Sequence, residues 1–369
     1  MLNLPGLYIH FPWCIKKCPY CDFNSHPKKG ELPQEVYFSA VEQDLTEQLK
    51  DYQVGDFGSV FFGGGTPSLM SPKYVERILK LANITDQTEV TLELNPGTLE
   101  FNSLEDFFAA GVNRLSIGAQ SFQNQHLKTL GRIHSEKETI VAFETARKAG
   151  FTNINIDLMW GLPKQSVQQS LADLNHAISL DPEHISWYQL TIEPKTEFYV
   201  KKPVLPSENI QTRIEQSGLK ILAENNYSRY EISAFCKLER ECRHNLNYWY
   251  FGDYIGIGAG AHGKVTGPNQ VLRIQKPNQP RIYQEDSLNS GSKTLKKNDL
   301  ILEFLMNTLR LVNGVDWCVF EQRTGLNFSD IEENWKRLVD INLLKTTSCC
   351  TTQFGYRHLD YILQDFTSL

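Results

Sequence analysis

The chain has 369 residues, a formal net charge of −6, 41% apolar residues and 22% charged residues. This composition is that of an ordinary globular protein, and its acidic balance excludes a general attraction to nucleic acid, so we expect no nucleic-acid partner. Single hydrophobic cores rarely exceed about 250–300 residues, so the length predicts a second domain. No apolar run approaches the roughly 18 residues of a membrane span, and no basic export signal precedes Lys16, so we expect a cytoplasmic protein with reduced cysteines.

A cysteine-rich loop follows the first expected strand. Cys14, Cys18 and Cys21 are spaced Cys-x3-Cys-x2-Cys, which matches neither the paired cysteines of zinc sites nor the ferredoxin run. Three thiolates on a [4Fe–4S] cluster would leave one iron open to another ligand, so the spacing favours a cluster that takes part in chemistry. Two alternatives stay open, namely three buried thiols and a zinc knuckle completed by His10 or His26.

Short β-type segments then alternate with helical patterns. Six strands are expected, at residues 7–10, 58–62, 89–94, 113–117, 153–158 and 184–191. Helix starts between them are indicated by Ser71 before Pro72 and by three capping pairs, Ser103 with Asp106, Ser135 with Glu138 and Ser166 with Gln169. The repeated βα pattern predicts a parallel sheet with right-handed crossovers, closed in part as a barrel.

In a parallel barrel, chemistry lies at the C-terminal ends of the strands. The glycine-rich segment 63–67 directly follows the second expected strand, and glycine lets a backbone approach a ligand closely. Polar side chains follow the later strands, namely Glu93, Gln120, Arg132 and Asp157. We expect these groups to share one ligand that carries both positive and negative charge.

These motifs together resemble the radical S-adenosylmethionine (SAM) superfamily, in which the open iron of the cluster chelates the amino-acid part of SAM. The segments GGGTP, ELNPG, GAQSF, GRIH and IDLMWGLP, in this order after YIHFPWCIKKCPYCDF, resemble its coproporphyrinogen-type branch up to about residue 263. The resemblance implies a [4Fe–4S] cluster on Cys14, Cys18 and Cys21. It also implies SAM contacts from Tyr8, Gly64, Gly65, Thr66, Glu93, Gln120, Arg132 and Asp157, with Thr191 as a looser match.

The branch contains oxygen-independent coproporphyrinogen III oxidases and haem chaperones, and three features favour a chaperone. Phe23 stands where the oxidases have a further cysteine, few residues precede Tyr8, and HNLNYW at 244–249 matches the chaperones' HNxxYW signature. The resemblance then implies haem as cargo and delivery to apo-proteins such as respiratory haemoproteins. Its candidate haem contacts are His244, Tyr248, Trp249 and His262.

Several alternatives remain open at this point. His244 could instead be a buried histidine that caps a loop. The chain could be the oxidase, a radical SAM enzyme of oxidative decarboxylation in porphyrin biosynthesis, or a protein whose cluster only staples its loop. Whether the chain is an enzyme, whether it dimerises and whether it makes peripheral contact with membrane haemoproteins stay undecided, and no catalytic residue is assigned.

The sequence predicts three parts. Residues 1–263 form an α/β partial (β/α)6 radical SAM barrel with the cluster loop and the HNxxYW segment, in which the glycine-dense stretch 252–263 passes the site or closes the barrel. Residues 264–295, with Pro268, Pro277 and Pro280, form a connecting segment. Residues 296–369 resemble a small, mainly helical winged-helix-like domain, with helices at 300–311 and near 328–339 and a pair of short segments at 343–346 and 353–357. Without a basic helix face, we expect it to be an interaction or lid module.

Overall fold

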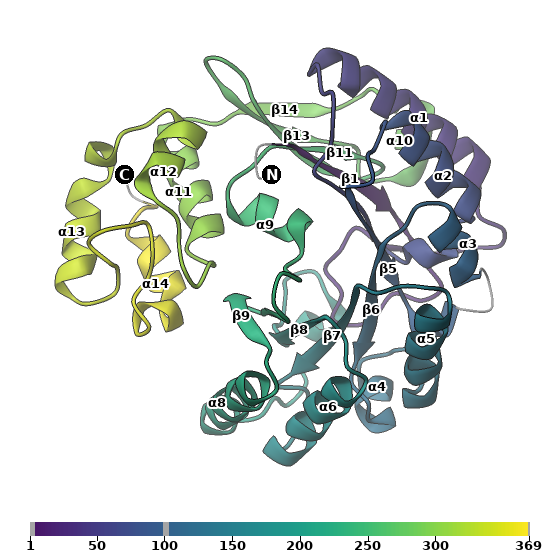
Figure 1. The fold of residues 1–369 in the computed structure, drawn as a ribbon, viewed down its shortest axis with the longest axis horizontal. Coiled ribbons are helices and arrows are strands. Elements are labelled where there is room, and N and C mark those ends of the chain that lie inside the picture. Colours follow the sequence, from purple (N-terminus) through teal and green to yellow (C-terminus); the bar gives the residue numbers. More distant parts are fainter. Residues whose placement is uncertain (1–3, 99–102, 368–369) are drawn as a thin grey trace.

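A curved parallel sheet forms the centre of the molecule (Figure 1). The computed structural model describes residues 4–98 and 103–367. The six expected strands are present in it as β1 (Gly6–Phe11), β4 (Ser59–Gly64), β5 (Glu89–Leu94), β6 (Arg114–Gln120), β7 (Ile154–Trp160) and β8 (His184–Gln189). They lie side by side in chain order and pair in parallel, so the predicted partial barrel is confirmed.

Helices cover the outer, convex side of this sheet (Figure 1). They are α1 (Gln34–Asp51), α2 (Pro72–Leu81), α3 (Leu104–Ala109), α4 (Asn124–Thr129), α5 (Glu136–Lys148), α6 (Val167–Ser179) and α8 (Glu208–Glu224), with the short α7 (Glu197–Val200) between strand and helix. Two of the predicted capping boxes are complete and begin α5 and α6. At α3 the Ser103 side chain accepts from the Asp106 N–H, which is one half of the predicted box. Pro72 starts α2, but within the described residues the Ser71 side chain forms no cap hydrogen bond.

Alternation along each strand separates the core from the site. On β1, Leu7, Ile9 and Phe11 are fully buried in the main hydrophobic core beneath the helices. The residues between them, Tyr8 and His10, therefore point to the concave side, because successive side chains of a strand face opposite ways. The same alternation on the other strands places polar side chains on the concave side, where the predicted site residues lie.

The segment expected to be a simple connection extends the sheet instead. Beside β1, β11 (Tyr254–Ile257) pairs in parallel, and β12 (His262–Thr266), β13 (Val271–Gln275) and β14 (Gly291–Thr294) follow in antiparallel order, with α10 (Pro280–Glu285) before β14. The prolines that suggested a connection lie outside the strand ladders, and Pro280 begins α10. Strand β11 covers the open edge of β1, as one reading of the glycine-dense stretch predicted.

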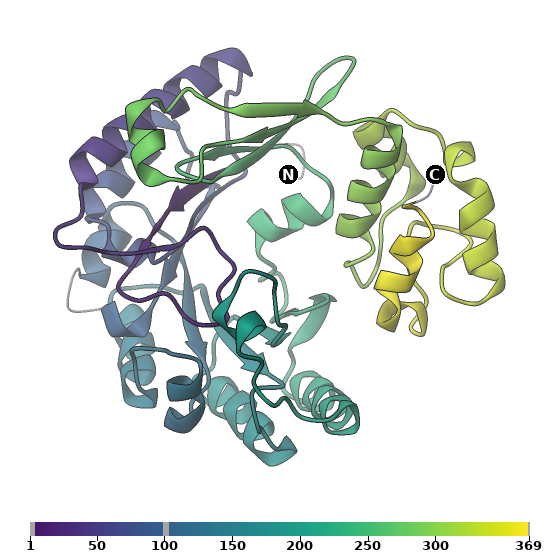
Figure 2. The same cartoon turned by 180° about the vertical axis from the view of Figure 1, so that it is seen from behind.

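At the other edge, β8 is followed by two antiparallel strands, β10 (Ala234–Cys236) and β9 (Ser228–Glu231). Helix α9 (Arg243–Trp249) then lies on the concave side, between the sheet and the C-terminal helices (Figures 1 and 2). This helix carries the whole HNxxYW motif, so its position decides what that motif can contact.

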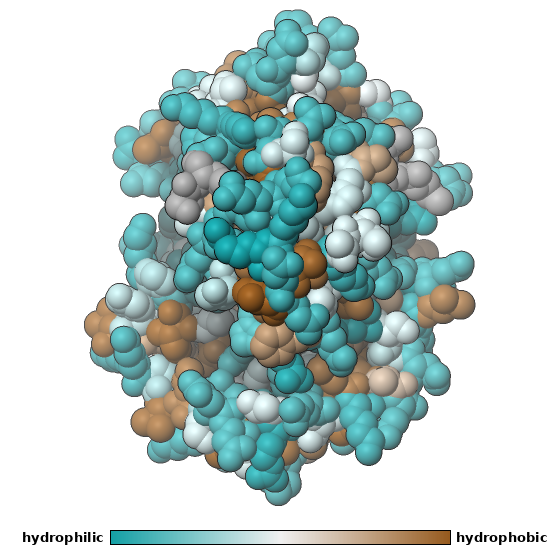
Figure 3. Space-filling model, turned by 90° about the vertical axis from the view of Figure 1, so that its left-hand side faces the viewer, coloured by the Kyte–Doolittle hydropathy of each residue, from teal (hydrophilic) through white to brown (hydrophobic). Residues whose placement is uncertain are grey.

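The C-terminal part has its own small core. It contains α11 (Lys297–Thr308), α12 (Trp317–Thr324), α13 (Glu332–Asp340) and α14 (Leu359–Gln364), packed around Phe304, Phe320 and Trp335. The outer face of this domain in Figure 3 is mainly hydrophilic, with separate apolar patches. Within residues 4–98 and 103–367, no helix has the length and apolar character needed to cross a membrane.

Two details of this domain differ from expectation. The helix near 328–339 is interrupted, since a 3-10 turn at Phe328–Asp330 precedes α13. The segment at 343–346 pairs through Leu344 with Thr351 instead of with 353–357, which ends in a 3-10 turn at Gly355–Arg357. A Cβ at Gly355 would lie 1.8 Å from the Leu343 carbonyl oxygen, so a close chain crossing replaces the expected pair.

Candidate functional site

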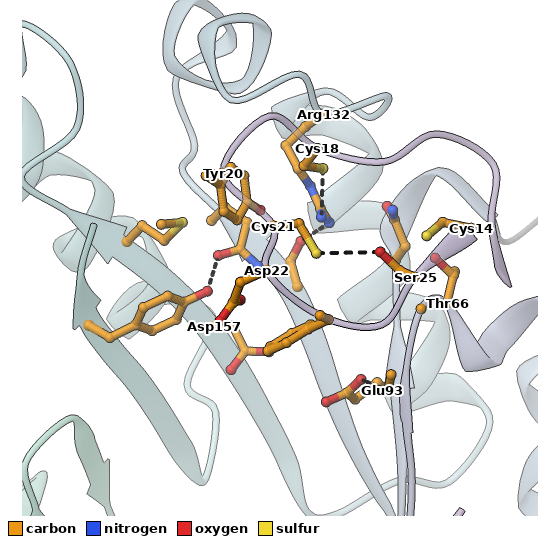
Figure 4. A pocket seen from close by; sticks show the side chains of 18 of the residues that line it. Cys14, Cys18, Tyr20, Cys21, Asp22, Ser25, Thr66, Glu93, Arg132 and Asp157 are labelled. Carbon is orange, nitrogen blue, oxygen red and sulfur yellow. Dashed lines mark hydrogen bonds between the residues drawn. The ribbon is translucent and has the colours of Figure 1, made fainter. Parts of the chain in front are cut away.

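The cysteine loop lies over the C-terminal end of the sheet. Its base is closed by two short strands, β2 (Trp13–Cys14) and β3 (His26–Pro27), which pair in parallel. Cys14 is buried, whereas Cys18 and Cys21 are half-buried, and all three line one cavity of about 420 Å³. Figure 4 shows Cys18 beside Arg132, Cys21 facing Ser25, and Cys14 near Thr66.

The donor chemistry of the loop fits an iron–sulfur cluster. In the described parts of the chain, no three His, Cys, Asp or Glu side chains are already grouped as a metal site. The three thiols nevertheless rim one cavity, and burial raises the pKa of Cys14 to about 11, so a bound metal is needed to hold it as a thiolate. Three soft donors on one loop suit a [4Fe–4S] cluster with one iron that has no protein ligand.

His10 and His26 are engaged elsewhere. The His10 ring hydrogen-bonds through Nδ1 to the Tyr8 hydroxyl (3.0 Å) and through Nε2 to the Asn24 carbonyl oxygen (2.9 Å). His26 Nε2 lies 3.2 Å from Asn24 Oδ1. Burial lowers the pKa of His10 to about 4, so its ring is neutral and serves to join strand β1 to the loop. This arrangement does not favour a zinc knuckle completed by His10.

The glycine segment passes directly under the loop. Gly65 donates its N–H to the Phe11 carbonyl oxygen (2.7 Å), and Thr66 donates to the Trp13 carbonyl oxygen (2.8 Å). A Cβ at Gly65 would lie 2.5 Å from the Trp13 oxygen, and one at Gly64 would lie 2.6 Å from the His10 ring. Gly64 also has φ +113°, a conformation that side chains rarely adopt. Glycine is therefore required here for close approach of two backbones.

Two half-buried carboxyl groups face the cavity, Glu93 from β5 and Asp157 from β7. Glu93 Oε2 accepts a hydrogen bond from the Gly64 N–H (3.1 Å). Burial, followed by the nearby Asp157 carboxyl, raises the pKa of Glu93 to about 8. Asp157 accepts from Ser116 Oγ (2.9 Å) and Asn155 Nδ2 (2.8 Å), and burial raises its pKa as well. Both groups would ionise more readily beside a bound cation.

Arg132 and Gln120 complete the polar lining. Arg132 donates from Nη2 to the Gly118 carbonyl oxygen (2.7 Å), and its buried Nε has no hydrogen-bond partner among the described residues. Gln120 has φ +67° and lies at an irregularity of the β6–β7 ladder, a strained conformation of the kind found at binding sites. The Tyr188 hydroxyl donates to Gln120 Oε1 (2.6 Å) and holds the amide in place.

The structure brings most of the expected site residues together. The 420 Å³ cavity is lined by Cys14, Cys18, Cys21, Gly64, Gly65, Thr66, Glu93, Gln120, Arg132, Asp157 and Thr191. Sequence reasoning missed Ser116, Ser186 and Tyr188, which line it too. Their signal was the alternation along β6 and β8, which places residues two apart on the same face.

A second cavity of about 600 Å³ adjoins the first. The residues that line both are Cys21, Asp22, Phe23, Gly64 and Glu93. Two expected haem contacts, Tyr248 and His262, line this second cavity together with Tyr254 and Lys17. Tyr8, which was expected to contact SAM, lines it as well. Burial, with the Arg273 guanidinium nearby, lowers the pKa of His262 below its ordinary value, which favours a neutral imidazole.

His244 lies below this cavity, at the floor of the barrel. It is 1% exposed, and its ring nitrogens hydrogen-bond to Ser59 Oγ (2.9 Å) and to the Tyr248 hydroxyl (2.9 Å). The ring stacks on Phe61 at 5.0 Å, and burial lowers its pKa to about 3. Both nitrogens are thus committed, which matches the alternative of a buried structural histidine.

Trp249 points in a third direction. It packs against the core of the C-terminal domain, where the Arg310 guanidinium lies 4.3 Å from the centre of its ring. Arg310 in turn pairs with the buried Glu231 at the sheet edge (2.9 Å). The four expected haem contacts therefore do not converge: two line the second cavity, one lies under it and one joins the two domains.

Comparisons with known proteins agree with this architecture. Residues 8–175 match the Radical SAM superfamily, and residues 295–348 match the HemN C-terminal domain. Over 333 residues the chain is 45% identical to the haem chaperone HemW of Escherichia coli (strain K12), covering 88% of each protein. The chain belongs to the HemW family.

Other HemW relatives cover almost the whole chain. The haem chaperone HemW of Haemophilus influenzae is 41% identical over 379 residues, which cover 99% of each protein. Among solved structures, the coproporphyrinogen III oxidase HemN of Escherichia coli superposes with a TM-score of 0.83 at 23% identity, over 100% of this chain and 91% of that one. The HemN likeness shows a shared fold, and the HemW relatives confirm the predicted branch.

Proposed function

We propose that this protein is a haem chaperone that binds a [4Fe–4S] cluster and SAM and delivers haem to apo-proteins. The observation that carries the proposal is the 45% identity over 88% of the chain to a protein named haem chaperone HemW. The paired cavities at the end of the barrel support it, because they provide separate but adjoining space for a cofactor and a cargo.

The first cavity suits SAM. Cys14, Cys18 and Cys21 would hold the cluster, which when bound supplies a one-electron centre with an open iron. Glu93 can pair with the SAM ammonium, Arg132 can bind the carboxylate through its planar fork, and Asp157 can accept from the ribose hydroxyls. The glycine segment leaves space beside the amino-acid part, and Gln120 and Tyr188 form the opposite wall.

Phe23 bears on the choice between chaperone and oxidase. Its side chain is 58% exposed and lines both cavities at the position where the oxidases have a further cysteine. An exposed phenyl ring cannot supply a thiolate or a proton, so it favours a binding role at this position over a redox one. The oxidase remains the alternative function, supported by the shared fold.

The proposal also covers the location of the protein, its domain boundaries and its partner proteins. We place the protein in the cytoplasm, keep the predicted boundary of the C-terminal domain near residue 295, and include residues 264–295 in the barrel domain because they extend its sheet. We assign the C-terminal domain to interaction with haem-accepting proteins, among them respiratory haemoproteins. The domain exposes single apolar side chains, including Phe354 and Tyr361, and its outer face is mainly hydrophilic (Figure 3). Such singly placed apolar side chains suit transient contacts better than a permanent interface.

The test is anaerobic. The reconstituted full chain is incubated with haem in one sample, and with coproporphyrinogen III, SAM and a reductant in another. Stable haem retention, transfer to an apo-haemoprotein and no decarboxylated product are expected. Decarboxylated product together with little haem retention would overturn the chaperone and favour the oxidase.

A further inference from the structure

The second cavity has a mainly polar lining that also contains three tyrosine rings, two lysines and a histidine. Aromatic rings of Tyr8, Tyr248 and Tyr254 line it, and these provide flat apolar surface. The Tyr248 and Tyr254 rings meet edge to face at 4.5 Å, so this part of the wall is rigidly packed. The cavity volume of about 600 Å³ is larger than that of the SAM-type cavity.

Charges divide unequally between the two cavities. Lys17 and Lys195 line only the second cavity, whereas the carboxyl groups of Asp22 and Glu93 lie on the boundary that it shares with the first. A dicarboxylate placed in the second cavity could therefore direct its acidic groups toward the two lysines. The side facing the SAM-type cavity would remain suited to a cation.

One nitrogen donor of this cavity is uncommitted. His262 lies at the start of β12 and is exposed to the cavity, and its imidazole hydrogen-bonds to no other residue within the described ranges. His10, the other histidine of the lining, has both ring nitrogens engaged by Tyr8 and Asn24. A neutral imidazole with a free nitrogen is a standard ligand for haem iron.

The two other possible iron ligands, His244 and Tyr248 of the HNxxYW motif, are less suitable. His244 is sealed beneath the floor with both nitrogens bonded. The Tyr248 hydroxyl is bonded to His244, and burial raises its pKa well above the ordinary value, which disfavours the phenolate that iron would need. Tyr248 can still form a wall, and His244 then acts as a positioning residue for it.

We infer that the cargo haem lies in the second cavity, with the His262 imidazole as its iron ligand and Lys17 and Lys195 facing its propionates. This inference rests on the proposed function, since it locates the cargo of the same chaperone. It assigns His244 to the support of the Tyr248 wall. It also places haem directly beside the SAM-type site, with Phe23 at their boundary.

The experiment compares single variants of the full chain. Ferric haem is titrated into the wild type, His262→Ala, His244→Ala and His358→Ala, the last being an exposed histidine of the C-terminal domain that serves as a matched control. Resonance Raman spectra excited in the Soret band report the axial ligand, and the haem Kd is measured in parallel. Far-ultraviolet circular dichroism checks that each variant is folded.

His262→Ala should lose the histidine-ligated spectrum and bind haem about tenfold or more weakly. Added imidazole should restore the spectrum in this variant, because it can enter the vacated position. His358→Ala should match the wild type, and His244→Ala should keep the histidine ligand even if its affinity falls. The double variant Lys17→Ala with Lys195→Ala tests the charges. It should weaken the binding of haem more than it weakens the binding of haem dimethyl ester.

Two results would overturn this inference while leaving the proposed function in place. The first is an unchanged axial-ligand spectrum in His262→Ala. The second is loss of the histidine-ligated spectrum in folded His244→Ala or His358→Ala, both of which should keep it. If the wild type binds no haem, the proposed function itself fails, so the two failures are distinguishable.

Discussion

Both ends of the barrel carry polar side chains, but the two ends use them differently. At the C-terminal end, Glu93 and Arg132 each retain unused bonding capacity, and Gln120 is held with positive φ. At the floor, the Glu89 carboxylate accepts from the first N–H groups of α9, and His244 has both nitrogens bonded. One end is prepared for a ligand, while the other end is closed by its own helix.

The comparison shows that a family motif does not by itself mark a ligand contact. HNxxYW begins at the closed floor, where the α9 N-terminus meets a buried carboxylate, an arrangement that stabilises a short helix. From there Tyr248 reaches up into the second cavity and Trp249 reaches out to the C-terminal domain. The hydrogen bonds that each side chain already makes therefore distinguish residues that support the fold from residues that are free to bind a ligand.

The largest expected effect is loss of the iron–sulfur cluster at the C-terminal end of the barrel. Cys18→Ser should abolish the cluster, because two thiolates of this loop cannot replace three, and should leave the fold intact, since Cys18 is only half-buried. Iron and sulfide content and the visible absorbance of the reconstituted protein measure the effect. Cys318→Ser, at an exposed thiol outside the loop, is the control and should keep the full cluster. A complete cluster in Cys18→Ser would remove the loop from its assigned role.

A smaller effect is expected at the glycine segment. Gly64→Ala places a Cβ against the His10 ring in a backbone conformation that alanine resists, so SAM affinity should fall by about 10- to 100-fold. Calorimetric SAM binding to the reconstituted protein measures this. Gly55→Ala is the matched control, because its Cβ would meet no atom of the described residues within 4 Å. Equal affinities of the two variants would contradict the close approach deduced here.

The closed end should respond in stability instead of in cofactor binding. His244→Ala removes two hydrogen bonds and the ring stack on Phe61, so the free energy of unfolding should fall by about 2 kcal/mol. Urea unfolding measures the loss, and the exposed His358→Ala should change it by less than about 0.5 kcal/mol. If His244→Ala were as stable as the wild type, the proposed difference between a structural floor and a ligand-binding C-terminal end would be wrong.

The last prediction concerns pH. The pKa of Glu93 is raised to about 8, so below that pH its carboxyl is mainly protonated and must lose a proton to pair with the SAM ammonium. SAM affinity should therefore rise between pH 6 and pH 7.5, by at most about tenfold per pH unit. Glu93→Gln should bind more weakly and lose this part of the pH dependence. A wild-type affinity independent of pH in this window would exclude Glu93 as the ammonium partner.

The sequence alone determined the features that depend on local pattern. The six parallel strands, the capping boxes at Ser135 and Ser166 and the grouping of Glu93, Gln120, Arg132 and Asp157 at one end are all present. These features are local because strand alternation, capping and the C-terminal edge of a parallel sheet follow from short-range rules. The cysteine spacing likewise identified the loop that rims the first cavity.

Only the tertiary structure decided which groups have partners. The pairing of β11 with β1 joins residues about 250 positions apart along the chain, and the sequence left open whether this glycine-dense stretch closes the barrel or passes the site. For the same reason the sequence could not show that His244 bonds to Ser59 while the His262 imidazole has no hydrogen bond to any described residue. Residue types and order are local properties, whereas hydrogen-bond satisfaction depends on contacts between distant segments, and here those contacts separate the floor from the site.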